Sequence, residues 1–318
     1  MKRFFLIFIL FLTFRAYSKN VLNNFKIKYL ILEDISRDRE IPIKIYYPDK
    51  KDKYPVIFFS HGLGGDREGG KDWGEYWSSN GYVSIHIQHH GSDIEVLKQK
   101  SGGIKDRVEE LLKHANTLNL IDRIRDSKFC VNYLSTLNLQ DNDLKGLLDT
   151  NRIGFSGHSF GALTTQCLAG QVFKLSNDKE INLYEEKIKA FIAFSPTVTK
   201  KIERYNFDKI FSPFLCLTGD KDEVKPIGAT PEERRIPFDN MPKNDKYLVI
   251  FKGANHMTFS GQHHFINSDN KSDKFSDFIK KITLSFWDYY LKGKIEAHEY
   301  LTKTFSNEIK NLGTFEVK

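Results

Sequence analysis

Cysteine is scarce in this chain of 318 residues: there are three in all, Cys130, Cys167 and Cys216. An odd and widely spaced set does not build a disulfide framework, even in an exported protein. Cys167 and Cys216 lie in apolar stretches, where a thiol packs as a small hydrophobic group. The chain is long enough to bury a large core, and we expect that core to hold the fold.

Long apolar runs and concentrated basic segments are also missing. The apolar stretch at residues 4–14 is well short of the about 20 residues that a helix needs to cross a bilayer. Lys and Arg number 48 against 41 Asp and Glu, and this excess is spread along the chain without an arginine-rich run. We therefore expect no nucleic-acid partner. The mild basic excess permits a transient contact with an anionic membrane surface, and no particular oligomeric state is indicated.

The first 18 residues have the pattern of a secretory signal peptide. Lys2 and Arg3 precede the apolar stretch, and Ala16-Tyr17-Ser18 forms a small-x-small cleavage site. Arg15 directly before that site leaves an uncleaved anchor as the alternative. The pattern predicts a secreted or periplasmic protein. Since no internal repeat or low-complexity linker follows, residues 19–318 are predicted to form one domain.

Short apolar runs alternate with helical patterns along the rest of the chain. An antiparallel pair at a sheet edge is predicted at residues 25–33 and 42–47. Buried strands are expected at residues 54–60, 81–88, 188–195, 211–218 and, as the last one, 247–251. A short helix is expected at residues 73–80 and a long helical region at residues 106–137. The chain is expected to finish with an amphipathic helix, one face of which carries Phe275, Phe278, Ile279, Ile282, Phe286 and Tyr289. This alternation predicts an α/β fold whose mostly parallel sheet has helices on both faces.

Residues 151–167, NRIGFSGHSFGALTTQC, read as a strand, a tight turn and a helix. The turn contains Gly157, Ser159 and Gly161 in the spacing G-x-S-x-G, which in this context is the nucleophile elbow of serine hydrolases. Glycine at both positions lets strand and helix pass closely. The alternative is a glycine-punctuated turn that holds a serine by chance. The context favours Ser159 as the nucleophile.

A serine hydroxyl needs a base to take its proton, and a histidine is suited to that task at neutral pH. Of the ten histidines, His256 directly follows the final predicted strand in a loop of small residues. His263 and His264 come slightly later and are the alternatives. The sequence therefore favours His256 as the base.

A carboxylate must orient that histidine and stabilise its charged form. Asp220 and Asp222 both follow the predicted strand at residues 211–218. Asp222 is far enough around the turn to face the histidine loop, whereas Asp220 is expected to form hydrogen bonds within the turn. We predict Asp222 as the acid, which gives the order Ser, Asp, His along the chain.

The glycine-rich loop His61-Gly62-Leu63-Gly64-Gly65 follows the buried strand at residues 54–60. Serine hydrolases bind the oxyanion with one backbone N–H after the nucleophile and one from a loop at this position. Leu63 and Phe160 are the candidates for these donors. The alternative is that the glycines only make a tight exit from the strand.

Three histidines, His86, His89 and His90, occur close together. No acidic or cysteine residue lies nearby at the spacing of a metal site. We therefore expect no metal and no cofactor, and expect His89 and His90 to line or support the cleft.

In these motifs the chain resembles the α/β-hydrolases, and most closely the branch with platelet-activating factor acetylhydrolase, the dienelactone hydrolase-like proteins and the cutinase-like polyesterases. The matching segments are His61-Gly62, the G-x-S-x-G turn at residues 157–161, residues 219–222 and residues 253–259. True dienelactone hydrolases have a cysteine at the position of Ser159, which argues against dienelactone as substrate.

The resemblance implies an α/β-hydrolase domain that hydrolyses short-chain or small acyl esters of small-molecule or lipid type without a cofactor. An acyl-enzyme mechanism with Ser159, His256 and Asp222 is the expectation. The alternatives are a phospholipase or lipase that works at an interface, in the manner of platelet-activating factor acetylhydrolase, a peptidase on the same scaffold, and a catalytically silent binding protein.

Overall fold

The computed structural model describes residues 24–99, 103–174, 180–198, 205–262 and 273–318. The predicted signal peptide, the alternative bases His263 and His264 and the start of the predicted domain at residue 19 lie outside these ranges. Among the described residues, no helix combines the length and the apolar character needed to cross a membrane.

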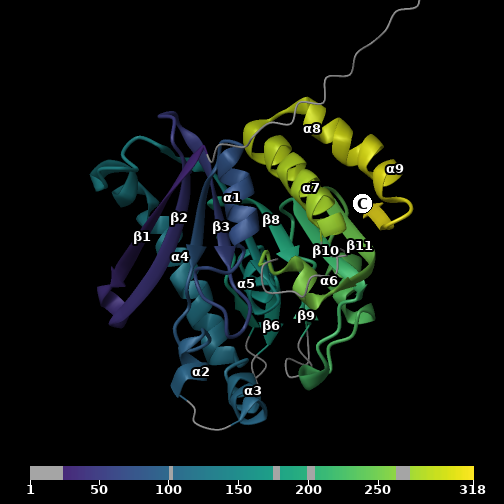
Figure 1. Ribbon diagram of the computed structural model, residues 1–318, viewed down its shortest axis with the longest axis horizontal. Coiled ribbons are helices and arrows are strands. Elements are labelled where there is room, and N and C mark those ends of the chain that lie inside the picture. The colour runs from purple at the N-terminus through teal and green to yellow at the C-terminus, as the bar shows by residue number, and fades with distance from the viewer. Residues whose placement is uncertain (1–23, 100–102, 175–179, 199–204, 263–272) are drawn as a thin grey trace, which may run out of the picture.

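A nine-stranded sheet runs through the described part of the chain in the order β1-β2-β4-β3-β5-β8-β10-β11-β12 (Figure 1). The six strands from β4 to β11 in this order are parallel. Antiparallel pairing occurs at both edges, between β1, β2 and β4 and between β11 and β12. The strands are β1 Phe25–Asp34, β2 Arg39–Pro48, β3 Tyr54–Ser60, β4 Val83–Ile87, β5 Leu148–His158, β8 Ile188–Phe194, β10 Phe214–Lys221, β11 Lys246–Asn255 and β12 Gly313–Val317.

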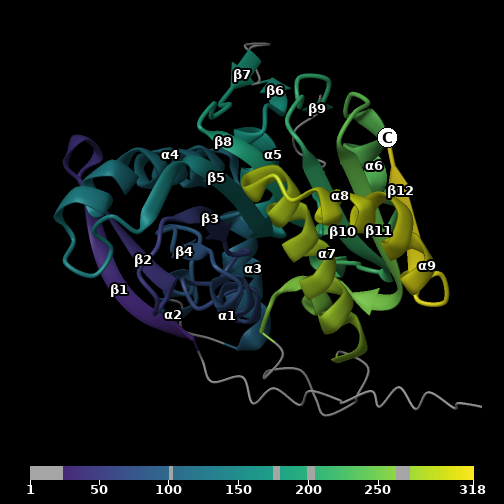
Figure 2. The same ribbon diagram turned by 90° about the horizontal axis from the view of Figure 1, so that it is seen from above.

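Helices cover both faces of this sheet, as Figure 2 shows. One hydrophobic core lies between the sheet and α4, α5 and α6, and a second lies between the sheet and α1, α7 and α9. The helices are α1 Lys71–Ser79, α2 Glu95–Gln99, α3 Ile104–Lys113, α4 Thr117–Gln140, α5 Phe160–Leu168, α6 Ile236–Asn240, α7 Asp273–Lys292, α8 Ile295–Glu299 and α9 Phe305–Ile309. Short helical turns are η1 Ile35–Arg37, η2 Lys225–Ile227, η3 Glu232–Arg235, η4 His256–Phe259 and η6 Tyr300–Thr304.

The predicted fold class is confirmed: this is the α/β-hydrolase arrangement. β3 consists almost entirely of buried residues, as its unbroken apolar run predicted. The antiparallel edge pair is also confirmed, with β1 and β2 in a register that places Leu30 opposite Ile43. The core thus holds the carboxyl ends of the parallel strands in fixed positions, and ligand sites of such sheets form at that edge.

The long helical region predicted at residues 106–137 is confirmed as helical, but the structure divides it into two helices, α3 and α4. Asn116 interrupts the pattern with an extended backbone, and its side chain accepts a hydrogen bond from the Asn119 N–H at 2.9 Å. Asparagine is among the best residues for capping a helix N-terminus in this way. The cap starts α4 afresh and lets α3 take a separate course.

The predicted end of the chain is also wrong. The amphipathic helix α7 is followed by α8, α9 and β12, and β12 extends the sheet beyond β11. A small sheet was not predicted; it consists of three short strands, β6 Val172–Lys174, β7 Glu180–Asn182 and β9 Tyr205–Asn206. These strands have two or three residues each, too few for an alternating pattern to be visible.

Candidate active site

Ser159 occupies a sharp turn between β5, which ends at His158, and α5, which begins at Phe160. Its φ of 56° lies in the left-handed region that residues with a side chain rarely adopt. Two backbone hydrogen bonds hold it there: the Ser159 N–H donates to Phe194 O at 2.9 Å, and the Leu163 N–H donates to Ser159 O at 3.1 Å. Such strain persists where the surroundings determine it, often at functional sites.

The two glycines of the turn are required by close backbone contacts. A Cβ atom on Gly161 would collide with the Ser60 carbonyl group at the end of β3, and one on Gly157 would collide with the Gly161 carbonyl group. Only glycine therefore allows β5, α5 and the end of β3 to meet at this point.

His256 and Asp222 lie side by side at the ends of neighbouring strands. His256 directly follows β11, Asp222 directly follows β10, and His256 Nδ1 lies 2.7 Å from Asp222 Oδ1. Thr218 Oγ1 donates to the other carboxylate oxygen at 2.8 Å. Burial of Asp222 opposes its ionisation, but the hydrogen bond with His256 and the charge of Arg234 outweigh burial and lower its pKa to about 2. The carboxylate is therefore charged at neutral pH.

Asp220, the alternative acid, has a different partner. Its Oδ1 accepts a hydrogen bond from the Gly253 N–H at 2.6 Å, which ties the end of β10 to that of β11. The structure therefore brings Asp222 and not Asp220 to His256. The expectation that Asp220 bonds within its own turn is wrong, because its carboxylate binds across to β11.

A cavity of about 370 Å³ brings the predicted site residues together, since Leu63, Ser159, Phe160 and His256 all line it. Asp222 lies behind His256, fully buried. Phe160 is the first residue of α5, so its N–H has no acceptor within the helix. Much of the remaining wall is apolar and consists of Val108, Leu111, Leu112, Ala115, Val224, Pro226 and Met257.

Arg234 belongs to the same site, although the sequence analysis missed it. Its buried guanidinium lies 3.2 Å from Asp222 Oδ1 and 3.4 Å from His256 Nδ1. It also donates to Thr197 Oγ1 at 2.8 Å and to Pro196 O at 3.1 Å. Arg234 thus joins the chain after β8 to Asp222 and His256. It comes from the short turn η3, and nothing in the local pattern distinguishes it from a surface arginine.

His158, which the G-x-S-x-G pattern treats as any residue, packs against His256. The ring centroids of His158 and His256 are 4.6 Å apart, and His158 Nε2 lies 3.0 Å from the His256 carbonyl oxygen. Burial, with a contribution from the nearby His256, lowers the pKa of His158 to about 3. His158 is therefore neutral and donates a hydrogen bond that fixes the backbone of His256.

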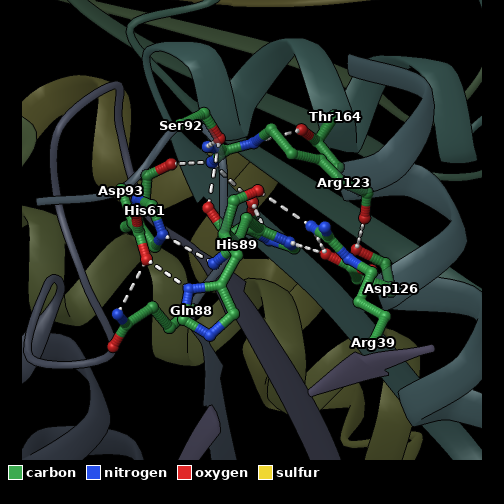
Figure 3. A network of polar contacts seen from close by, with 12 residues as sticks. Arg39, His61, Gln88, His89, Ser92, Asp93, Arg123, Asp126 and Thr164 are labelled. Atoms are coloured by element: carbon green, nitrogen blue, oxygen red, sulfur yellow. Dashed lines mark hydrogen bonds and ion pairs between the residues drawn. The ribbon is translucent and has the colours of Figure 1, made fainter. Parts of the chain in front are cut away.

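A buried polar network lies beneath the glycine-rich loop, and Figure 3 shows its members. Arg39 donates to both carboxylate oxygens of Asp126, at 2.7 and 2.9 Å. His89 is buried between Asp126 Oδ2, 3.1 Å from Nδ1, and Ser60 Oγ, 3.0 Å from Nε2. His90 instead lies 2.9 Å from Asp93 through Nδ1 and is partly exposed. The described residues contain no group of three or more His, Cys, Asp or Glu side chains arranged to hold a metal.

Comparisons with known proteins agree with the resemblance seen in the motifs. The family model described as platelet-activating factor acetylhydrolase, isoform II, matches residues 19–96. A platelet-activating factor acetylhydrolase of Cavia porcellus is 23% identical over 289 residues, which cover 79% of this chain and 61% of the relative. One of Canis lupus familiaris is 23% identical over 295 residues, 77% of this chain and 62% of the relative.

These findings support the predicted likeness to the platelet-activating factor acetylhydrolase branch of the α/β-hydrolases. The chain spans 61 to 62% of the length of the relatives that it matches. The segment matched by the family model contains Leu63 and ends before Ser159. The roles of Ser159, Asp222 and His256 therefore rest on the geometry described above.

Replacing Gly161 with alanine should disrupt the turn, because its Cβ would meet backbone rather than a side chain that can move. Overpacking commonly costs about 1–3 kcal/mol, and we expect a loss at or above the upper end of that range. Urea denaturation measures it. Gly103→Ala is the control, since a Cβ there has only one neighbour, 3.7 Å away, and should cost less than about 1 kcal/mol. Equal stability of the two variants would contradict the proposed close approach.

Stability should fall as the pH drops below about 6.5. Burial holds the pKa of His61 well below its usual value and lowers the pKa of His86 to about 3, of His89 to about 4 and of His158 to about 3. The unfolded chain binds these protons near pH 6.5 and the folded chain does not, so each histidine removes up to about 1.4 kcal/mol per pH unit below 6.5. Urea denaturation at pH 7 and pH 5.5 tests this.

His86→Gln should reduce the number of protons that the chain binds on unfolding at low pH by about one, and the pH dependence of the free energy of unfolding should fall accordingly. A free energy of unfolding that is the same at both pH values would show that these histidines titrate normally in the folded state.

Proposed function

We propose that the chain hydrolyses carboxylic esters through an acyl-enzyme, and that its substrates are lipid-type or other small esters with a short acyl group. One observation carries the proposal: Ser159 on its strained turn and His256, paired with Asp222 at 2.7 Å, line the same cavity. The similarity to platelet-activating factor acetylhydrolases supports the same class of reaction.

In the proposed reaction, Ser159 Oγ attacks the ester carbonyl carbon while His256 Nε2 takes the hydroxyl proton. Asp222 accepts the hydrogen bond from His256 Nδ1–H, which selects the correct tautomer and stabilises the charged imidazole. Collapse of the tetrahedral intermediate breaks the bond to the alcohol, which leaves with the proton from His256. A water molecule then attacks the acyl-enzyme with the same base and releases the acid and Ser159.

The negative charge of the intermediate falls on the former carbonyl oxygen. The Leu63 and Phe160 N–H groups are the proposed donors to this oxygen. Both residues line the cavity with Ser159, Leu63 from the loop after β3 and Phe160 from the start of α5. One such donor contributes about 2.7–4 kcal/mol to the barrier in related chemistry. The proposal needs no cofactor.

The cavity favours a short acyl group. Its volume of about 370 Å³ is near the lower end of the range for small-molecule sites, and its apolar wall offers little to a charged group. The matched relatives are named acetylhydrolases, which agrees with a small acyl product. A lipid substrate would be met by transient contact with a membrane surface, and the signal-like residues 1–18 support an exported enzyme.

The purified enzyme should hydrolyse p-nitrophenyl acetate and butyrate faster than the decanoate, and Ser159→Ala should abolish this activity with the fold intact, as circular dichroism would show. Removal of a triad serine costs about 10⁶-fold in kcat in a well-studied protease. Wild-type rates in the pure variant would exclude Ser159. A sharp rise in rate above the critical micelle concentration of the substrate would favour an interfacial lipase. Equal rates on amide and ester substrates would favour a peptidase.

Asp222→Asn should lower kcat by about 10⁴-fold, since an asparagine leaves His256 in the wrong tautomer. Asp220→Asn is the matched control: Asp220 is two residues away, is exposed near the end of β10, and its carboxylate contacts Gly253 rather than His256. The control should keep kcat within a few-fold of wild type. If the two variants lost activity equally, or only Asp220→Asn did, the assignment of the acid would be wrong.

A further inference from the structure

We infer that His61 is a positioning residue that aims the Leu63 N–H at the oxyanion. The inference rests on the proposed ester hydrolysis and assigns a task to a histidine that neither the mechanism nor the cavity chemistry uses. His61 begins the glycine-rich loop after β3 and is almost completely buried.

The peptide group between Gly62 and Leu63 is held at its carbonyl end. The Gly62 carbonyl oxygen lies 2.6 Å from His61 Nδ1 and accepts a further hydrogen bond from the Gly65 N–H at 3.1 Å. In a planar trans peptide the C=O and the following N–H point in opposite directions. By fixing the Gly62 carbonyl, His61 therefore fixes the direction of the Leu63 N–H, which points away from the imidazole. Leu63 itself lines the cavity beside Ser159.

The partners of its two ring nitrogens determine the tautomer of His61. The His89 N–H donates to His61 Nε2 at 3.1 Å, so this nitrogen carries no hydrogen. Nδ1 therefore carries the hydrogen and donates it to the Gly62 carbonyl. Burial, and next the charge of Arg123, hold the pKa of His61 well below its usual value. Both ring nitrogens are occupied, so His61 does not exchange protons with substrate and acts only through the loop.

Arg123 lies in the same network as His61 and Thr164, as Figure 3 shows, and contacts the two segments that carry the predicted oxyanion donors. Its guanidinium donates to the His61 carbonyl oxygen and, at 3.2 Å, to Ser60 Oγ. It also donates to Thr164 Oγ1 on α5 at 3.2 Å and lies 4.7 Å from the centre of the Phe160 ring. The loop that carries Leu63 is thereby held against the helix that carries Phe160. Burial lowers the pKa of Arg123 to about 9, so it remains charged at neutral pH.

A matched control exists one strand away. His86 in β4 is fully buried, its Nδ1 lies 2.7 Å from the Gly69 carbonyl oxygen, and its Nε2 lies 3.0 Å from Ser84 Oγ. Like His61, it is a neutral buried histidine whose Nδ1 faces a glycine carbonyl. It has no contact with the peptide group that carries the Leu63 N–H. Variants at the two positions therefore distinguish a loss of stability, expected for both, from a loss of oxyanion stabilisation, expected only at His61.

The experiment compares His61→Phe with His86→Phe, since phenylalanine keeps the ring volume and removes both nitrogens. Both variants should lose stability, but only His61→Phe should lower kcat, by about 10- to 100-fold, with KM within about threefold of wild type. His61→Asn, whose amide can donate from near the position of Nδ1, should recover at least a tenfold higher kcat than His61→Phe. His61→Ala replaces His61→Phe if the latter does not fold.

A second measurement tests the oxyanion directly. For each variant, kcat/KM is measured for an ester and for the matching thionoester, whose C=S sulfur accepts hydrogen bonds weakly. Wild type and His86→Phe should prefer the oxygen ester strongly, and in His61→Phe that preference should fall by about the same factor as kcat. This ratio does not depend on how much of the protein is folded.

Two outcomes overturn the inference while leaving ester hydrolysis intact: an active wild type with His61→Phe indistinguishable from His86→Phe, or a lower kcat with an unchanged preference for the oxygen ester. A wild type that hydrolyses neither ester overturns the proposed function, and the inference with it.

Discussion

The close approach of Gly161 to the Ser60 carbonyl is the contact on which the rest of the site depends. Because no Cβ fits there, the end of β3 and the first turn of α5 meet backbone to backbone. That meeting places the loop after β3 beside the turn that carries Ser159, so that N–H groups from two distant segments can face one point. A side chain at this position would separate them by the width of its atoms.

Charge around the site is arranged in two buried groups, each built on one arginine. Arg123 holds the glycine-rich loop to α5, and Arg234 holds Asp222, His256 and the chain after β8 together. A buried cation is costly unless its donors are used, and both guanidiniums have oxygen partners on several segments. Three of the neutral histidines lie near these charges: besides burial, Arg123 lowers the pKa of His61 and His89, and Arg234 contributes to the lowered pKa of His158.

The parts of the site that could be predicted from the sequence are those that follow a buried strand. Ser159, Asp222 and His256 each come at the end of an apolar run, and parallel strands bring their carboxyl ends to one edge. Asp222 was favoured over Asp220 because it lies further around the turn, and the structure has Asp222 at 2.7 Å from His256 and Asp220 bound to Gly253.

Arg123 and Arg234 could not be identified in this way, because their partners lie 31 or more residues away along the chain for most contacts and leave no periodic pattern. The break between α3 and α4 had a local signal, the capping side chain of Asn116, which the long helical pattern obscured. β12 pairs with β11 across the intervening α7, α8 and α9, and its five residues resemble many loops.

The break between α3 and α4 divides the site between two helices. Three apolar residues of the cavity wall, Val108, Leu111 and Leu112, belong to α3, whereas the arginine that braces the loop belongs to α4. The two helices are separate units with their own boundaries. Substitutions on α3 and substitutions at Arg123 therefore alter two different parts of the site. The wall of the cavity and the support of the loop are encoded by separate stretches of the chain, residues 104–113 and 117–140.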